Sequence, residues 1–164
     1  MDEETLEILK LDNQICFPLY AASRLVVQAY RPLLADLGLT YPQYLVMLVL
    51  WENDGMSVGQ IGELLFLDSG TLTPLLKRLE KQGLVERKRR VEDDRTVENR
   101  VTPEGRALQE RAVDVPNNLI CNAQLEMDGL LELKGNLRSL LGKLLVYHGI
   151  VDDRIGDLSA KPEA

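Results

Sequence analysis

The sequence predicts a mainly helical fold with one small β-hairpin. Leucine is frequent and aromatic residues make up only 5% of the chain, a composition typical of helical proteins. Apolar residues recur at helical spacing through most of the chain, and the period changes to that of strands over 84–89 and 97–102. Hydrophobic residues fill 45% of the 164 positions, enough for a core. We therefore expect a single domain over 1–151 and a flexible tail over 152–164.

The sequence carries no signal for a membrane, a secretory pathway or a metal. No apolar run reaches the roughly 18 residues needed to span a bilayer, and the first residues, MDEETLEILK, are too acidic for a secretory signal or transit peptide. We therefore expect a cytoplasmic protein that does not bind a membrane. Two distant cysteines and a single histidine do not match zinc-ligand spacing, so we expect neither a metal nor another cofactor.

The first long helix is expected to begin close to the first cysteine. Proline fits best in the first turn of a helix because it lacks an N–H, so Pro18 places the helix start near 13–17. Cys16 then lies at the N-terminus, where free N–H groups and the helix dipole favour the thiolate. Tyr20 follows one turn later, with a hydroxyl that can donate to the sulfur. We expect Pro32 to end or bend this helix.

A buried helix is expected next, over the segment YPQYLVMLVLWE. Either Thr40 or Tyr41 caps it, with Pro42 at its first position. Apolar residues on nearly all faces of a short helix indicate that it is buried. The Asn-Asp-Gly sequence at 53–55 ends it.

Two short helices follow, over 57–65 and about 71–82. Ser57 is expected to cap the first of them. If Thr71 caps the second, Pro74 lies at the third helical position, where its missing N–H costs no hydrogen bond. Two short helices joined by a tight turn that contains glycine match a helix-turn-helix, whose second member is the recognition helix.

A charged β-hairpin is expected directly after the recognition helix. Gly83 ends that helix as a C-cap glycine does, and the strands over 84–89 and 97–102 flank a charged loop. The formal net charge is −7, yet 77–100 carries nine basic and six acidic residues, against ten and twenty elsewhere. A basic hairpin after a recognition helix defines a winged helix-turn-helix and indicates double-stranded DNA as a partner.

The recognition helix and the wing would supply the DNA contacts, within a region of about 53–102. Hydroxyl groups near the helix start can read base edges, and cationic side chains further along can reach bases or phosphates. The contacts expected from the helix are Ser69, Thr71, Thr73, Lys77 and Arg78. At the wing tip, Arg95 suits a narrow, negatively charged minor groove, and Asp93 would brace its guanidinium.

Two further helices are expected beyond the wing. Thr102 caps the first, which starts at Pro103, is interrupted near Pro116 and resumes through Cys121. The second begins near Asp128 and carries leucines at helical spacing. These helices exceed what a small winged helix needs, and two DNA half-sites call for two-fold symmetry. We therefore expect a homodimer, with simple extension of the core as the alternative.

Three stretches carry a resemblance to a known family: LDNQICFPLYAASR, YRPLLADLGLTYPQYLVMLVLWE and LDSGTLTPLLKRLEKQGLVERKR. They resemble the MarR family of bacterial transcriptional regulators and, within it, the organic hydroperoxide resistance regulators. Asp93 and Arg95 of the wing mark the family, and Cys16 in its LDNQ-C-F context marks the peroxide-sensing branch. Pro18 stands where we expect a small residue, and the wing strand at 98–100 is more polar than the usual apolar pattern.

This resemblance implies a homodimeric repressor of an adjacent peroxide-detoxification gene, with helices 11–36 and 103–148 forming the dimer. An organic hydroperoxide would oxidise the Cys16 thiolate to a sulfenic acid, and the operator DNA would be released. Tyr30 and Tyr41 would reach the thiolate from the other subunit, with Tyr20 nearby.

The second cysteine has two interpretations. By the resemblance, Cys121 takes the place of the resolving cysteine of two-cysteine members, which implies an intersubunit disulfide with Cys16. The alternative is a cysteine in a helix core. The apolar neighbours of Cys16 favour alkyl or lipid hydroperoxides over hydrogen peroxide.

Three other functions compete with this one. A MarR-type regulator released by a small amphipathic ligand would be indifferent to Cys16→Ser. A thiol peroxidase would need a scaffold with a reductant site, and the sequence has neither a C-x-x-C motif nor alternating βαβ units, so we do not expect an enzyme. A plain helical interaction protein would leave the basic wing unexplained. Tyr44, Tyr147 and His148 are given no functional role.

Overall fold

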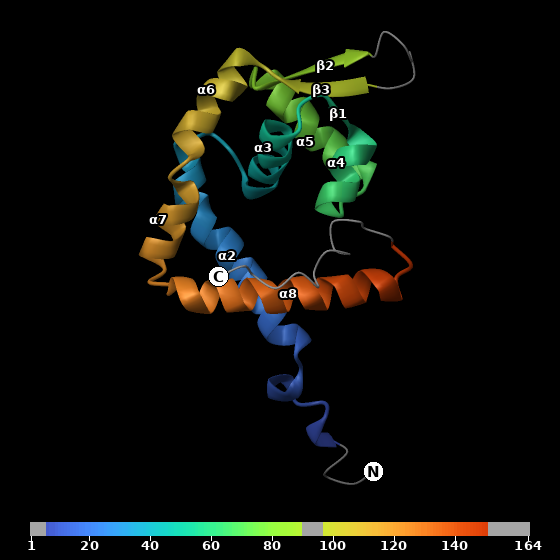
Figure 1. Cartoon of the computed structure of the whole chain (residues 1–164), viewed down its shortest axis with the longest axis vertical. Coiled ribbons are helices and arrows are strands. Elements are labelled where there is room, and N and C mark those ends of the chain that lie inside the picture. The colour runs from blue at the N-terminus through green and yellow to red at the C-terminus, as the bar shows by residue number, and fades with distance from the viewer. Residues whose placement is uncertain (1–5, 90–96, 151–164) are drawn as a thin grey trace. The chain divides into compact units, whose positions relative to one another are not determined.

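The computed structural model describes residues 6–89 and 97–150 (Figure 1). The chain divides into two compact units, one up to Leu119 and one from Ile120 onward. Within the described ranges, no helix is long and apolar enough to cross a membrane, and no group of three or more metal-ligating side chains comes together. The tail expected over 152–164 lies outside the described residues.

The observed elements confirm the predicted fold class, mainly helical with one small β-hairpin. Those of the first unit are, in chain order, η1 (Leu11–Asn13), α2 (Cys16–Ala35), α3 (Tyr41–Glu52), β1 (Met56–Ser57), α4 (Val58–Leu65), α5 (Ser69–Lys81), β2 (Val85–Arg89), β3 (Val97–Val101) and α6 (Pro103–Ala112). Helix α7 (Val115–Asn122) runs across the division, and α8 (Met127–Tyr147) belongs to the second unit.

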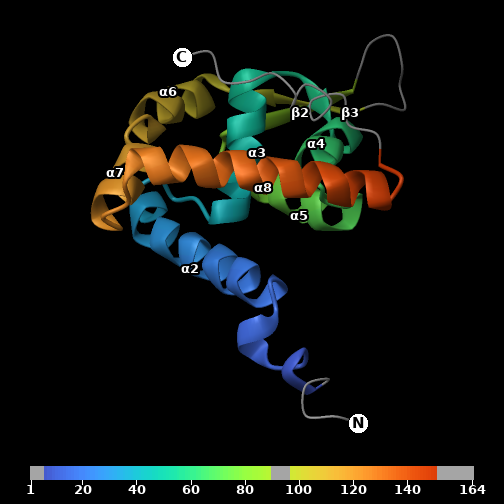
Figure 2. The same cartoon turned by 60° about the horizontal axis from the view of Figure 1, so that its bottom comes forward.

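Helix α2 begins at Cys16, as the sequence predicts, and Pro18 lies in its first turn. The expectation that Pro32 ends or bends this helix is wrong about the end, because the helix continues to Ala35 with the proline inside it. An internal proline removes one backbone hydrogen bond. Burial offsets this cost, since Leu34 in the last turn is fully buried. Figure 2 shows the N-terminal half of α2 extending away from the rest of the first unit.

Helix α3 is buried, as its apolar faces predict. Thr40 caps it, and both the N–H and the hydroxyl of Thr40 donate to Gln43 Oε1, at 2.9 and 2.8 Å. Pro42 occupies the second helical position rather than the expected first, which is equally free of cost because the first four N–H groups have no helical partner. The core cluster around this helix includes Leu34, Val46, Met47, Leu50, Ile61, Leu72, Leu76, Leu79, Val85 and Leu108.

The helix-turn-helix is confirmed, with a correction to its second helix. Ser57 caps α4, accepting from the Gln60 N–H at 3.2 Å. Helix α5 begins at Ser69, and of the candidate capping residues Asp68, Ser69 and Thr71 it is Asp68 that caps it. The carboxylate of Asp68 is the stronger acceptor and takes both the N–H and the hydroxyl of Thr71.

The corrected start moves the proline of α5 deeper into the helix. Pro74 is now an internal residue of the helix instead of lying at the third position. It therefore removes one helical hydrogen bond. Three leucines on the opposite face compensate, because Leu72, Leu76 and Leu79 are fully buried.

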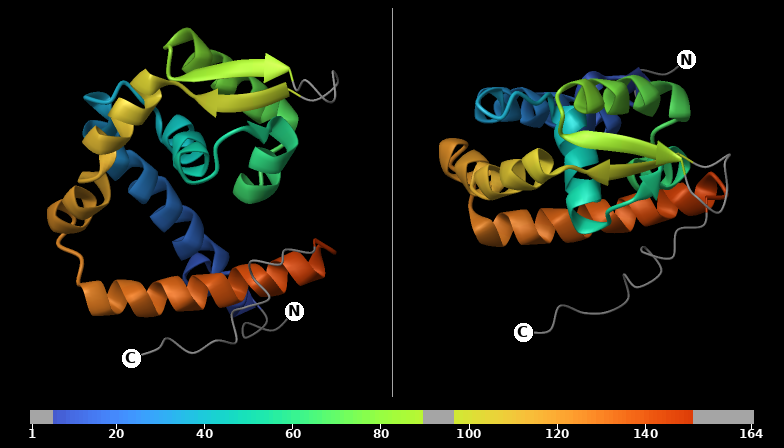
Figure 3. Two further views of the ribbon diagram at one scale, coloured as in Figure 1. Left: turned by 45° about the horizontal axis from the view of Figure 1, so that its top comes forward. Right: turned by 90° about the horizontal axis from the view of Figure 1, so that it is seen from above.

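Strands β2 and β3 form the predicted hairpin, with Val85 opposite Val101. The sequence missed a third strand: β1 pairs antiparallel with β3, with Met56 opposite Asn99, so the strand order is β1-β3-β2. Two residues are too short to reveal a period of two. Figure 3 shows the hairpin running beside α4 and α5.

The start of α6 requires a glycine. Thr102 caps this helix as predicted and accepts from the Gly105 N–H at 3.0 Å. A Cβ on Gly105 would lie 2.2 Å from the Leu84 carbonyl oxygen and 2.7 Å from Val101 Cγ1. The Trp51 ring N–H donates to the Gly105 carbonyl at 2.9 Å, which ties α6 to α3.

The break between α6 and α7 confirms the expected interruption near Pro116. Helix α6 ends at Ala112, and Pro116 lies in the first turn of α7, where a proline costs no hydrogen bond. The interruption therefore falls just before the proline. In the second unit, α8 starts one residue before the predicted Asp128 and ends near Gly149, whose φ is +67°.

Helix α8 exposes much of its apolar surface. Leu131, Leu133 and Leu144 are 60%, 51% and 46% exposed. A shallow groove of about 310 Å³ runs along the helix and is lined by leucines together with Lys134 and Arg138. An apolar face of this extent is typical of a surface that another chain covers.

Candidate functional site

Cys16 occupies the first position of α2 and is an exposed, free thiol. Ile15 and Phe17 beside it are 77% and 40% exposed. Ile15 is the N-cap residue of α2, and it has no side-chain oxygen that could accept from the free N–H groups of the first turn. The thiol therefore lies in an apolar surface at an uncapped helix N-terminus.

Tyr20, one turn beyond Cys16, contacts the side chain of Arg24. The Arg24 guanidinium donates to the Tyr20 hydroxyl at 2.9 Å and lies 5.5 Å from the centre of its ring. The phenolic proton of Tyr20 remains available as a donor, because a hydroxyl accepts and donates at once. Tyr20 is 59% exposed, so this donor faces outward.

Tyr30 and Tyr41, which the sequence assigned to the thiolate, lie together in the first unit. Their ring centres are 4.8 Å apart, and Tyr44 lies 5.9 Å from Tyr30. Burial raises the pKa of Tyr30 and of Tyr41, and the neighbouring Tyr41 raises that of Tyr30 further. Both phenols therefore stay protonated at neutral pH and act as donors. Tyr44 is a core residue, as expected, and is 2% exposed.

The tyrosine pair does not lie beside the cysteine of the same chain. Tyr30 follows Cys16 by fourteen residues on one continuous helix, a separation of about 21 Å along its axis. The structure therefore brings Tyr30 and Tyr41 to each other but not to Cys16 of the same subunit.

A groove of about 960 Å³ borders this tyrosine pair. It runs along α2 and over the start of α3 in the first unit. Tyr41 and Leu39 line one part of it, and Arg24, Gln28 and Arg31 line another. The groove thus combines apolar walls with two guanidinium groups and a phenol.

Cys121 lies in the second unit, at the penultimate position of α7. Like Cys16 it is an exposed, free thiol. The interpretation of Cys121 as a core cysteine is not supported, because its side chain is exposed in this chain.

The predicted DNA contacts of α5 share its outer face. Lys77 and Arg78 are exposed, as are Ser69 and Thr71, whereas Thr73 is half-buried. The Thr71 hydroxyl donates to Asp68 Oδ2 at 2.7 Å. Asp93 and Arg95 lie outside the described residues, so their assignment stays a prediction.

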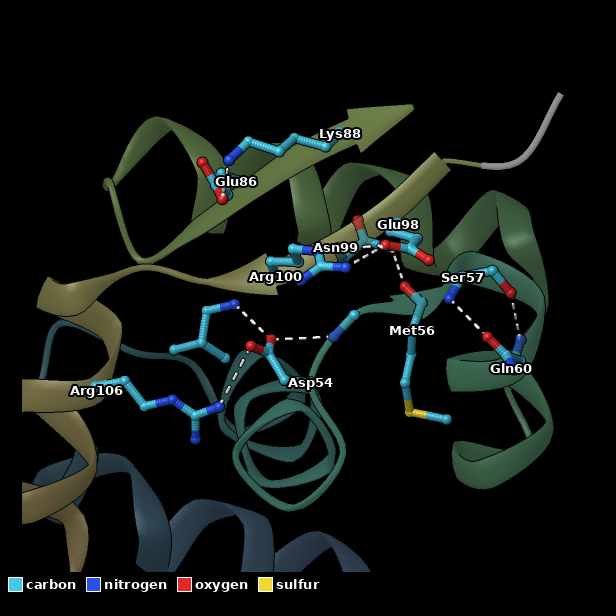
Figure 4. A network of polar contacts seen from close by, with 12 residues as sticks. Asp54, Met56, Ser57, Gln60, Glu86, Lys88, Glu98, Asn99, Arg100 and Arg106 are labelled. Atoms are coloured by element: carbon cyan, nitrogen blue, oxygen red, sulfur yellow. Dashed lines mark hydrogen bonds and ion pairs between the residues drawn. The ribbon is translucent and has the colours of Figure 1, made fainter. Parts of the chain in front are cut away.

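A polar network at the base of the wing was missed by the sequence analysis (Figure 4). Asp54 Oδ1 accepts from the N–H of Val101 at 2.8 Å, and its other oxygen lies 3.5 Å from Arg106. The buried Asn99 donates to the Met56 carbonyl at 2.9 Å. The Asn-Asp-Gly signal indicated a helix end, and nothing in it indicated that Asp54 would bind a strand 47 residues away.

Asn99 and Glu98 are the polar residues that depart from the apolar wing pattern. Asn99 is fully buried and Glu98 is 8% exposed. Arg100 donates to Glu98 Oε2 at 2.9 Å. The Asn99 side-chain N–H and the Glu98 carboxylate thus have partners, as buried polar groups usually do, whereas Asn99 Oδ1 is buried without a hydrogen-bond partner among the described residues.

Comparison with known proteins shows the family to which this chain belongs. Residues 28–111 match the family model described as transcriptional regulator SarA/Rot. The organic hydroperoxide resistance transcriptional regulator of Bacillus subtilis is 48% identical over 142 residues, covering 87% of this chain and 97% of that protein. These relatives are regulators rather than enzymes.

Solved structures of AbfR, a protein of Staphylococcus epidermidis, share the fold. Reduced AbfR bound to DNA matches with a TM-score of 0.71 and 37% identity, covering 87% of this chain and 99% of that one. A structure of disulfide-formed AbfR matches with a TM-score of 0.59 and 37% identity, covering 86% and 99%.

Proposed function

The chain belongs to the MarR-type transcriptional regulators, in the SarA/Rot group, and we propose from this that it is a homodimeric repressor controlled by oxidation of Cys16. The observation that carries the proposal is the exposed Cys16 thiol at the uncapped N-terminus of α2, in an apolar surface. At such a position an apolar peroxide can reach the sulfur.

The first step is an attack of the Cys16 thiolate on the terminal oxygen of an organic hydroperoxide. A sulfur–oxygen bond forms and the O–O bond breaks, giving a sulfenic acid and an alkoxide that leaves as the alcohol after taking a proton. The sulfur is oxidised by two electrons and the peroxide is reduced. The apolar side chains of Ile15 and Phe17 beside the thiol favour alkyl or lipid hydroperoxides over hydrogen peroxide.

The donors for this step would come from the second subunit. Tyr30 lies about 21 Å along α2 from the Cys16 of its own chain, with Tyr41 of α3 beside it, and both are protonated phenols. A two-fold dimer can bring them to the other Cys16, and the groove beside Tyr41 offers room for it. Tyr20 would add a donor from the same chain.

The second step would join Cys16 to Cys121 of the other subunit. The Cys121 thiol attacks the sulfenic sulfur, water leaves, and an intersubunit disulfide forms, which protects against over-oxidation. The exposure of both thiols supports this, as does the match to a disulfide-formed relative. The disulfide would pull the subunits out of the spacing that two DNA half-sites require.

DNA binding would use the winged region over about 53–102. Helix α5 enters the major groove with Ser69, Thr71 and Thr73 near the bases and its cationic residues near phosphates, and Arg95 with Asp93 serves the minor groove. The helices over 11–36 and 103–148 would form the dimer, which covers the exposed leucines of α8.

A mobility shift on the upstream DNA of its own gene tests the proposal. We expect the wild type and Cys16→Ser to bind equally when reduced, and an organic hydroperoxide to release only the wild type. Cys121→Ser is the matched control: it should still respond but give no dimer-sized band on non-reducing electrophoresis. Release of Cys16→Ser by the peroxide would contradict the proposal, and a monomer-sized wild-type band would reject the intersubunit disulfide.

A second candidate is release by a small amphipathic ligand. The groove beside Tyr41 favours it, because its apolar walls and two arginines suit an organic anion. Such a ligand would release Cys16→Ser as readily as the wild type, with no oxidant present. The same mobility shift therefore separates the two candidates.

A further inference from the structure

The first turn of α5 holds its threonine hydroxyls in defined hydrogen-bond directions. The Thr71 hydroxyl donates to Asp68 Oδ2 at 2.7 Å, and the Thr71 N–H donates to the other carboxylate oxygen at 2.9 Å. The Thr73 hydroxyl donates to the Ser69 carbonyl at 2.7 Å. A hydroxyl has one proton and two lone pairs. Each threonine has therefore used its only side-chain donor inside the helix.

The groups that receive these protons are acceptors only. A backbone carbonyl has no proton to return, and neither has an ionised carboxylate. The hydrogen bonds from the Thr71 hydroxyl and N–H lower the pKa of the Asp68 carboxyl, so it stays ionised at neutral pH. In both hydrogen bonds the threonine hydroxyl is therefore the donor at neutral pH, and its lone pairs are what it can offer to another molecule.

We propose that Thr71 and Thr73 contact the operator only as hydrogen-bond acceptors, so that Asp68 sets part of the base preference without touching the DNA. The inference rests on the proposed binding of DNA by α5. In the major groove, adenine and cytosine present an amino donor, whereas the hydrogen-bonding groups of guanine and thymine are all acceptors. Acceptor-only hydroxyls therefore favour adenine or cytosine.

A hydroxyl that can only accept can bind a base amino group but not a phosphate oxygen. Phosphate oxygens accept and do not donate, so they repel a hydroxyl that offers only lone pairs. Within residues 6–89 and 97–150, the exposed Ser69 side chain makes no hydrogen bond, so its hydroxyl can donate to a phosphate. Ser69 is thus the internal contrast to Thr71 and Thr73.

The test begins with an operator that the reduced, full-length protein selects from random double-stranded DNA. Affinities are measured for all base pairs at each position, with the wild type and with Thr71→Val and Thr73→Val. Valine keeps the shape and the methyl groups but removes the hydroxyl. The position read by a threonine is the one at which its valine variant loses discrimination. If neither variant loses discrimination anywhere, the inference is overturned.

Base analogues then decide the direction of the hydrogen bond. At the Thr71 position, adenine is replaced by nebularine, or cytosine by 2-pyrimidinone, which both lack the amino group. We expect the wild type to lose about five- to tenfold in affinity, the worth of one net hydrogen bond, and Thr71→Val to lose nothing further. A wild-type preference for guanine or thymine at that position would mean that Thr71 donates, and would overturn the inference.

Asp68→Asn tests the role of the carboxylate. Asparagine caps a helix about as well as aspartate, but its amide can donate to the Thr71 hydroxyl and release the hydroxyl proton. We expect the amino preference at the Thr71 position to shrink to within twofold. An unchanged preference in a folded Asp68→Asn variant, judged by circular dichroism, would overturn the role of Asp68.

The outcomes also distinguish this inference from the function on which it rests. If the reduced wild type selects no sequence, DNA binding itself is refuted. If it selects an operator that Thr71 and Thr73 read through guanine or thymine, the repressor stands and only the acceptor polarity fails.

Discussion

The two helices to which we assign sensing and DNA contact begin in opposite ways. Helix α2 starts at Cys16 behind Ile15, which offers no capping oxygen, whereas α5 starts behind Asp68, whose carboxylate takes two hydrogen bonds from Thr71. In the first turn of α2 no side chain acts as a cap, the Phe17 N–H donates to the Gln14 carbonyl at 3.2 Å, and Pro18 has no N–H. The N-terminus of α5 has its donors satisfied and presents acceptors. The two helix starts therefore present different groups: α2 an exposed thiol, and α5 threonine hydroxyls whose protons are used inside the helix.

We expect the largest effect on stability at the start of α6, where the residue that donates to the capping Thr102 must be a glycine. Gly105→Ala places a Cβ 2.2 Å from the Leu84 carbonyl, so we expect a loss of about 3 kcal/mol in the free energy of unfolding. Urea denaturation measures it. Gly129 is the matched control, since it lies in the first turn of α8 with nothing within 4 Å. Gly129→Ala should leave stability unchanged or slightly higher, and an equal loss in both variants would refute the steric argument.

Asp54 is a carboxylate that accepts from the backbone of strand β3, whereas Asp68 accepts from the first turn of a helix. Asp54 accepts from the Val101 N–H and approaches Arg106, so Asp54→Ala leaves the N–H without its partner. We expect a loss of about 1–2 kcal/mol in unfolding free energy, together with weaker operator binding, because β3 carries the wing. Asp54→Asn keeps one accepting oxygen and should recover most of the loss. No difference between the two variants would show that the Val101 bond is unimportant.

The uncapped start of α2 can be altered directly. Ile15→Asp places a negative charge beside Cys16 and disfavours the thiolate, so we expect oxidation by an organic hydroperoxide to slow by about three- to tenfold. Stopped-flow measurement of thiol loss gives the rate. Ile15→Asn is the neutral control, because it caps the helix as aspartate does but carries no charge, so the difference in rate between the two variants isolates the effect of the charge. Equal slowing in both variants would mean that loss of the apolar side chain, not the charge, is responsible.

The capped start of α5 predicts the smallest effect, a pH dependence of stability. The pKa of Asp68 is lower in the folded chain than its ordinary value of 3.8, so the unfolded chain takes up the proton first. The stabilisation is present above pH 3.8 and is lost as the pH falls through the folded-state pKa. Urea denaturation between pH 5 and pH 3 should show a steeper decline for the wild type than for Asp68→Asn. Parallel declines would contradict this.

The sequence anticipated those elements whose signals are local. Pro18 beside Cys16 located the start of α2, Ser57 and Thr102 located two caps, and the change of period located the hairpin. Where several local signals compete, the sequence left the choice open: Asp68, Ser69 and Thr71 are all capping residues, and the folded helix shows that Asp68 is the cap. Pro32 looked like an end because propensity ignores the burial of Leu34.

In the candidate site, too, local features could be predicted from the sequence and long-range contacts could not. The first turn of α2 makes Cys16 a sensor candidate by helix chemistry that any reader of the sequence can apply. The sequence could not reveal that Asp54 reaches Val101, that β1 joins the wing, or that Tyr30 stacks near Tyr41, because these contacts join residues distant along the chain.

The sequence by itself determined the order of the elements, the fold class and the position of the thiol, because proline, glycine and capping residues act within one helical turn. Only the tertiary structure decided that the Asp54 carboxylate accepts from Val101 at the base of the wing and that β1 pairs with β3. Those outcomes depend on which donor lies within about 3 Å of which acceptor, a quantity that the folded backbone alone specifies.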